Sequence, residues 1–147
     1  MQANELFNPE KISILEYKYI KGQIDTPEDF NIEKVKGHDL ENTLQLGFNL
    51  DDKLAKADFF FNIQTKSSSD NQNEASGAFH LVFIYKIENI EELVSISKEG
   101  HLEVNSWLGN ALASITYSTS RGILLTRLQG TVFQNFILPV INPDNLL

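Results

Sequence analysis

Residues that could carry out acid–base, nucleophilic or metal chemistry are few and widely separated in this sequence. The histidines are His38, His80 and His101; none has a second histidine four residues away, and the chain has no cysteine. Structural zinc sites are built from clusters of Cys and His, so we predict neither a metal site nor a cofactor. Ser67 to Ser69 lie in a polar stretch with no candidate base beside them. A serine nucleophile needs such a base, so we predict that the protein is not an enzyme.

Two short clusters, Asp51-Asp52-Lys53 and Glu16-Tyr17-Lys18, contain the carboxylate and lysine groups found in nuclease sites. The charge of the whole chain argues against that function, because twenty acidic and twelve basic residues give a net charge of -8. Nucleic-acid binding needs a basic surface that displaces phosphate counterions. We therefore interpret the clusters as a solvated turn and a strand face, and predict no nucleic-acid partner.

Length and composition favour one cytoplasmic domain that covers residues 1–147. The absence of cysteine suits a reducing compartment. Residues 1–10 lack the basic cap and apolar core of a secretory signal. No apolar run approaches the roughly 18 residues of a membrane span, so no membrane insertion is expected.

Four stretches have the composition and alternation of strands, at residues 11–24, 44–50, 59–66 and 79–87. The long connection at residues 26–41 favours a crossover over a hairpin. In the first strand, strict alternation places Tyr17 and Tyr19 with Leu15, opposite the isoleucines. Residues 89–100 form an acidic turn or short helical piece. We predict an α+β fold, a four-stranded antiparallel sheet with a long crossover after strand 1 and one long C-terminal helix packed on it.

That helix is predicted over residues 105–130, with Ser106 as N-cap and Gly130 as its stop. Its apolar and small residues follow two helical paths, whereas a helix covered from one side needs only one. We predict burial by the protomer's own sheet and by a second copy; the alternative is an ordinary core helix with a wide apolar face. The expected contacts between copies are Tyr17, Tyr19, Leu112, Ile115, Tyr117 and Gly122.

Some aromatic and aliphatic residues lie at positions where burial in the protomer is not expected. Phe60 falls on the polar side of its strand, and Trp107 stands at the start of the helix. An exposed apolar patch of this kind marks a binding surface, although each residue could instead belong to the core. The predicted binding residues are Phe30, Val35, Leu46, Phe48, Phe60 and Trp107.

The end of the helix and the tail resemble the protein-export chaperone SecB. The resemblance lies in Gly130-Thr131 and Leu138-Pro139-Val140, together with Gln134, Asn142, Asp144 and Leu146. The family has an Arg-Gly-Thr-Phe-Pro-Gln run there, followed by Pro-Val-Asn-Phe-Asp-Ala-Leu. The resemblance implies an ATP-independent holdase for non-native polypeptides, assembled as a tetramer of two dimers, which delivers its clients to SecA.

Three departures from the family's pattern matter, and the last two bear on the SecA partner. Gln129 replaces the family's Arg before the Gly-Thr pair, Gly22 replaces an acidic residue of the first strand and leaves only Asp25, and the family continues past Leu147 into a second helix and a mobile tail. A SecB-like chaperone of an antitoxin is therefore the variant to consider. The alternative from a different class is a small-ligand-binding α+β domain, and the mass in solution separates a tetramer from that monomer.

Overall fold

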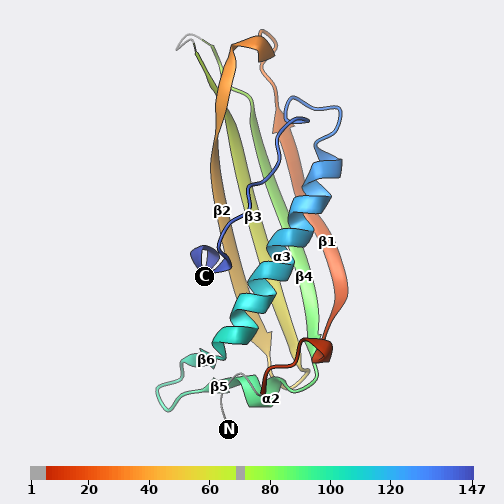
Figure 1. The fold of residues 1–147 in the computed structure, drawn as a ribbon, viewed down its shortest axis with the longest axis vertical. Coiled ribbons are helices and arrows are strands. Elements are labelled where there is room, and N and C mark those ends of the chain that lie inside the picture. Colours follow the sequence, from red (N-terminus) through yellow and green to blue (C-terminus); the bar gives the residue numbers. More distant parts are fainter. Residues whose placement is uncertain (1–5, 69–71) are drawn as a thin grey trace.

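A four-stranded antiparallel sheet with one long helix across one face makes up the computed structural model, which describes residues 6–68 and 72–147 (Figure 1). The elements of this body are β1 (Ile12–Asp25), β2 (Val35–Asn49), β3 (Leu54–Ser67), β4 (Ser76–Ile87) and α3 (Ser106–Arg127). The strand order is β1-β4-β3-β2, so the connection between β1 and β2 crosses from one edge of the sheet to the other. The predicted α+β class, crossover and long helix are confirmed.

The crossover is shorter than expected, because β2 already begins at Val35. The prediction of a connection over residues 35–41 is wrong. This half of β2 is an edge strand with polar side chains on both faces, such as Lys36, His38 and Glu41, so the apolar alternation that marks a strand is missing. The crossover itself contains a short 3-10 helix, η2 (Ile32–Lys34).

The expected division of β1 between its two faces is also wrong. The pairing of β1 with β4 shifts register between Ile14 and Glu16 and again between Tyr19 and Lys21. Each β-bulge adds one residue and reverses the alternation that follows it. The helix-facing side of β1 consequently contains both isoleucines and tyrosines, namely Ile12, Ile14, Tyr17, Tyr19 and Ile24.

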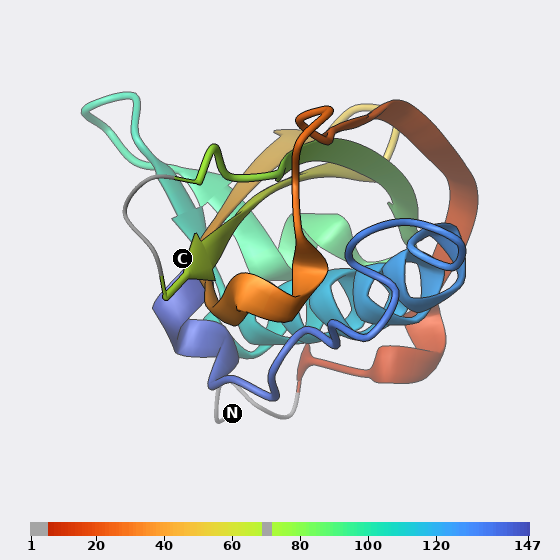
Figure 2. The same cartoon turned by 90° about the horizontal axis from the view of Figure 1, so that it is seen from above.

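The core lies between α3 and the face of the sheet that it crosses. Side chains that are at most 1% exposed there come from both layers, namely Phe59, Phe61, Leu81, Phe83, Tyr85, Leu108, Leu112 and Leu124. The Tyr85 and Thr116 hydroxyls form a hydrogen bond of 2.7 Å inside this core. Seen from above, the curved sheet has α3 and the C-terminal segment on the same side (Figure 2).

The N-cap of α3 is Asn105 and not Ser106, because the Asn105 side chain accepts hydrogen bonds from the backbone N–H groups of Trp107 and Leu108. The helix ends at Arg127, and Gly130 follows with a φ of +78°, the left-handed conformation of a helix stop. The stop predicted at Gly130 is confirmed.

Residues 89–104 contain more structure than the expected turn or short helix. They form α2 (Ile90–Leu93) and a hairpin of β5 (Val94–Ile96) and β6 (Leu102–Val104) that projects beyond the end of the sheet (Figure 1). Two further 3-10 helices are η1 (Pro9–Lys11) before β1 and η3 (Pro143–Leu146) at the C-terminal end.

Candidate functional site

The segment after α3, residues 131–147, runs along the helix side of the sheet between α3 and β2 (Figure 1). We call this segment the tail. Phe133 and Leu138 anchor it, since they are 1% and 4% exposed and belong to the core. The Phe136 ring lies 5.1 Å from the His38 ring of β2 and 6.0 Å from the Phe61 ring of β3. The tail is therefore an integral part of the helix-side layer.

Two polar contacts fix the second half of the tail against α3. The Tyr117 hydroxyl donates a hydrogen bond to the Pro139 carbonyl. The Asn110 side-chain amide donates one of 2.8 Å to the Asp144 carboxylate. Together they hold the tail at a defined position beside the helix.

Helix and tail enclose a furrow, which we call the helix–tail furrow. Its first part, near the start of α3, is lined by Phe7, Ser106, Trp107, Asn110, Ala111 and Asp144. Its second part is lined by Ser114, Tyr117, Ser118, Arg121, Val140, Ile141, Pro143 and Leu146. The two parts are neighbouring hollows, and the hydrogen bond between Asn110 and Asp144 crosses from helix to tail where they meet.

Charge is distributed unevenly between the two layers of the molecule. Residues 105–147 hold a single acidic residue, Asp144, and both arginines of the chain, Arg121 and Arg127. The other nineteen of the twenty acidic residues lie in residues 1–104.

The Arg127 guanidinium carbon lies 4.4 Å from the centre of the Tyr19 ring. Burial raises the pKa of Tyr117, and the nearby positive charge of Arg121 opposes that shift. Arg121 thus points its charge at the furrow.

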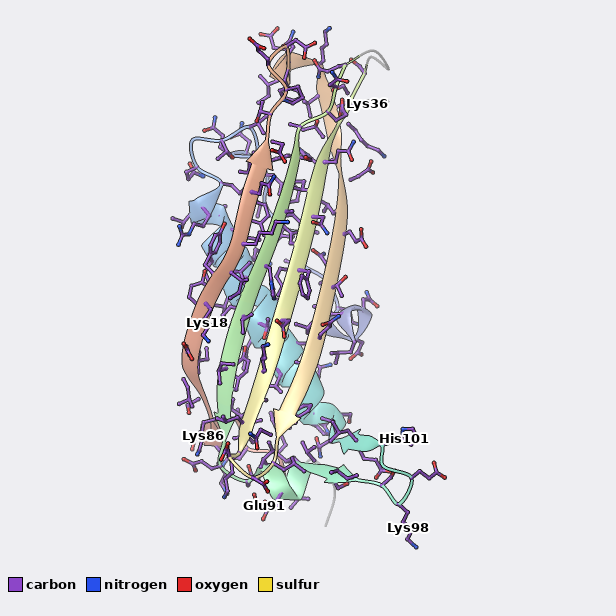
Figure 3. The ribbon with its side chains drawn as sticks, turned by 180° about the vertical axis from the view of Figure 1, so that it is seen from behind. Lys18, Lys36, Lys86, Glu91, Lys98 and His101 are labelled. Atoms are coloured by element: carbon purple, nitrogen blue, oxygen red, sulfur yellow. The ribbon has the colours of Figure 1, made fainter. Side chains whose placement is uncertain are left out.

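Within the described residues, no helix covers the opposite face of the sheet (Figure 3), and polar side chains such as Asp58, Asn62 and Gln64 of β3 lie there. Phe60 lies on this face and stacks on His80 at 4.1 Å between ring centroids, and His80 Nε2 is 2.8 Å from Asp58 Oδ1. Val82 of the central strand β4 is only 4% exposed although it lies on this face.

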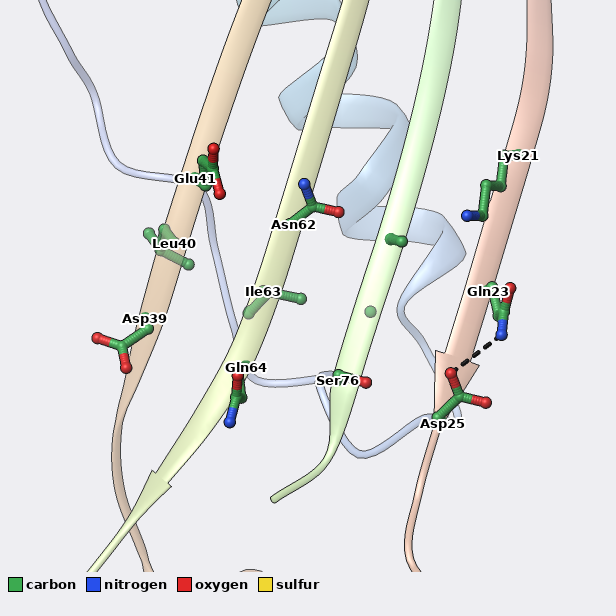
Figure 4. Close-up of a pocket in the computed structure, with 12 residues that line it drawn as sticks. Lys21, Gln23, Asp25, Asp39, Leu40, Glu41, Asn62, Ile63, Gln64 and Ser76 are labelled. Atoms are coloured by element: carbon green, nitrogen blue, oxygen red, sulfur yellow. Dashed lines mark hydrogen bonds between the residues drawn. The ribbon is translucent and has the colours of Figure 1, made fainter. Parts of the chain in front are cut away.

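An acidic depression lies at one end of the same face (Figure 4). Asp25 of β1 and Asp39 and Glu41 of β2 contribute its three carboxylates, with Lys21 beside them. Asp25 accepts a hydrogen bond of 3.0 Å from Gln23, and Asp39 is 3.1 Å from Lys66 Nζ. This surface suits basic side chains of a partner.

The structure distributes the six predicted binding residues over separate surfaces. Phe30 and Val35 lie at the crossover end, and Leu46 and Phe48 are half-buried on the helix side of β2. Phe60 is on the opposite face of the sheet. It is paired with His80 of β4, and it does not belong to the row of buried side chains of β3. Trp107 is 53% exposed and is the one predicted residue that lines the furrow.

The predicted contacts between copies divide into two groups. Leu112 is fully buried in the protomer and Tyr117 is 5% exposed, so their side chains already pack in the protomer's own core. Tyr17, Tyr19, Ile115 and Gly122 keep surface that another molecule can cover. The buried residues of α3 form one stripe that faces the sheet, and it includes Leu108 and Leu112 of one predicted path and Ala113, Tyr117 and Leu124 of the other.

The residues first considered for chemistry lie far apart. His38 packs against tail aromatics, and burial lowers its pKa. His101 is exposed beside the β5–β6 hairpin. Within residues 6–68 and 72–147, no group of three or more His, Asp or Glu side chains is placed to hold a metal ion. In the same part of the chain, no helix is long and apolar enough to cross a membrane.

Sequence reasoning missed the furrow, because the residues that join its walls are 22 and 34 positions apart in the chain and Arg121 has no local pattern that distinguishes it. Two signals were available. The tail is apolar although it is irregular, and both arginines lie on a helix without an acidic residue.

Neither a family model nor a curated protein matches the sequence. A solved structure does match, that of the Mycobacterium tuberculosis Rv1957 SecB-like chaperone in complex with a ChAD peptide from the Rv1956 HigA1 antitoxin. The TM-score is 0.61 with 11% identity, over 90% of this chain and 91% of that chain. The chain has the fold of a SecB-like chaperone. This confirms, at the level of the fold, the resemblance found in the helix and tail.

Proposed function

We propose that the protein is an ATP-independent holdase that binds an extended segment of a non-native polypeptide, or of an antitoxin, in the helix–tail furrow. The observation that carries the proposal is the exposed apolar surface on both walls of that furrow. Trp107 on the helix is 53% exposed and Val140 on the tail is 85% exposed. Apolar side chains gathered at the surface in this way mark interaction sites. The antitoxin peptide named with the Rv1957 chaperone supports a polypeptide ligand of this kind.

The test is suppression of the aggregation of an unfolded protein, followed by light scattering without ATP. We expect the wild-type protein to suppress aggregation and Trp107→Ala to do so less well. Ile96→Ala is the matched control, because Ile96 is 62% exposed but lies on the hairpin, outside the furrow. Unchanged scattering in the presence of excess protein would refute the holdase.

We also propose that the holdase acts in the cytoplasm as a tetramer of two dimers. Exposed apolar side chains at the β1 edge support this assembly, namely Ile14, Leu15, Tyr17 and Ile20. The outer side of α3 supports it as well, since the whole helix has no acidic residue. Light scattering coupled to gel filtration should give four times the chain mass of 16.7 kDa, and a stable monomer would favour the small-ligand-binding domain instead. Delivery of clients to SecA stays a prediction of the resemblance.

A further inference from the structure

We infer that Arg121 makes the helix–tail furrow selective for polypeptide segments that carry an aspartate or glutamate among apolar residues. The inference rests on the proposed function and names the chemistry of the ligand that this site prefers.

The surroundings of Arg121 are those of a small binding site for a carboxylate. The second part of the furrow has a volume of about 190 Å³. Ser114, Tyr117 and Ser118 lie beside Arg121 on the helix wall, and the tail wall opposite is apolar, with Val140, Ile141, Pro143 and Leu146. The Ser114 hydroxyl donates to Asn110 Oδ1 at 3.4 Å and the Tyr117 hydroxyl donates to the Pro139 carbonyl. The Ser118 hydroxyl and the Arg121 guanidinium are therefore the donors that the helix wall offers to carboxylate oxygens, and the tail wall covers the apolar neighbours.

Arg121 has no acidic partner within the described part of the chain. The ion pairs there join Lys18, Lys53, Lys56, Lys66 and His80 to carboxylates, and Arg121 takes part in none of them. The side chain is nevertheless half-buried. Its guanidinium is not among the buried polar groups without a hydrogen-bond partner in the described residues, so it stays accessible to a ligand. A carboxylate can satisfy it through two parallel N–H···O bonds.

The other arginine shows what a satisfied position on the same helix is like. Arg127 lies over the Tyr19 ring at 4.4 Å, an interaction worth about 0.5–1 kcal/mol at exposed sites. Arg127 therefore has a partner inside the protomer, whereas Arg121 makes neither an ion pair nor a cation–π contact within the described residues.

A second copy of the chain is a poor source of that carboxylate if it docks through α3. Among residues 105–147 the only acidic side chain is Asp144, and Asn110 already holds it at 2.8 Å. A bound polypeptide is the better source. The preference is also opposite to that expected from the net charge of -8, which by itself attracts basic partners.

The test uses three fluorescent peptides with the same apolar sequence and a central Asp, Asn or Lys, bound to the full chain and followed by anisotropy. We expect the wild-type protein to prefer the Asp peptide over the Asn peptide by about tenfold, the effect of a charged hydrogen-bonded pair that is partly screened by solvent. Arg121→Gln should remove the preference and Arg121→Glu should shift it towards Lys. Arg127→Gln is the matched control and should leave it unchanged, with thermal unfolding showing that all variants are folded.

The outcomes separate the two proposals. If all three peptides bind the wild-type protein equally well, the selectivity is wrong and the holdase stands. If no peptide binds, both are wrong. If Arg121→Gln lowers the mass of the assembly while Arg127→Gln does not, the partner of Arg121 is a second copy, and the selectivity is again wrong.

Discussion

Replacement of Phe133 by alanine tests whether the tail is a structural wall of the furrow. The Phe133 ring is 1% exposed and lies 6.0 Å from the His38 ring. It also covers the helix side of β4 at Gly77, where an added Cβ would lie 3.5 Å from the ring. The ring therefore joins the tail to β2 and β4 at once.

The magnitude follows from the loss of a buried aromatic ring. Phe→Ala substitutions in cores cost about 3–5 kcal/mol. We expect about 3 kcal/mol, the lower end of that range, because the tail is a surface layer and can close over part of the cavity. In a chain of this size, each kcal/mol lowers Tm by about 2–4 °C, so Tm should fall by about 6–12 °C.

The assay is urea unfolding followed by circular dichroism, with Ile137→Ala as the control. Ile137 lies four residues further along the same tail and is 62% exposed, so its truncation should cost less than about 0.5 kcal/mol. Phe133→Ala should also weaken peptide binding, because it loosens one wall of the furrow. If the two variants have the same free energy of unfolding, the tail does not pack as described.

Three further predictions concern pH, the core and the assembly. Burial lowers the pKa of His38 in the folded state, so the unfolded state binds the proton more tightly and stability should fall as the pH drops below about 6.5. The variant His38→Leu should therefore flatten the dependence of Tm on pH between pH 7.5 and 5. Parallel pH profiles of the variant and the wild-type protein would contradict this. Thr116→Val leaves the Tyr85 hydroxyl buried without its partner and should lower the free energy of unfolding, measured with a denaturant, by about 1–3 kcal/mol. Adding Tyr85→Phe should recover part of that loss. No recovery in the double variant would count against the Tyr85–Thr116 hydrogen bond. Gly122→Leu meets no atom within 4 Å of the new Cβ in the protomer, so it should leave the fold intact but lower the mass measured by light scattering, and an unchanged tetramer would show that Gly122 lies outside the interface.

Local patterns in the sequence predicted most of the fold. The alternation in residues 44–50, 59–66 and 79–87 identified three strands, since one face of each is buried and the other is mostly polar, with Phe60 and Val82 as exceptions. The helical spacing before Gly130 identified α3, which ends at Arg127, and Gly130 follows in the left-handed conformation common after helix ends. The net charge and the short resemblance in the tail were available without any coordinates.

Only the tertiary structure decided which of these surfaces meet. The two bulges of β1 depend on its pairing with β4, so alternation within β1 alone wrongly separated Tyr17 and Tyr19 from the isoleucines. The start of β2 could not be recognised in the sequence, because this segment is a strand through its pairing with the neighbouring strand and not through a pattern of its own apolar residues. The furrow exists because the tail returns along α3 and brings Val140 opposite Arg121. Periodicity along a chain encodes the structure of each segment, whereas the contacts between distant segments depend on packing that no local pattern contains.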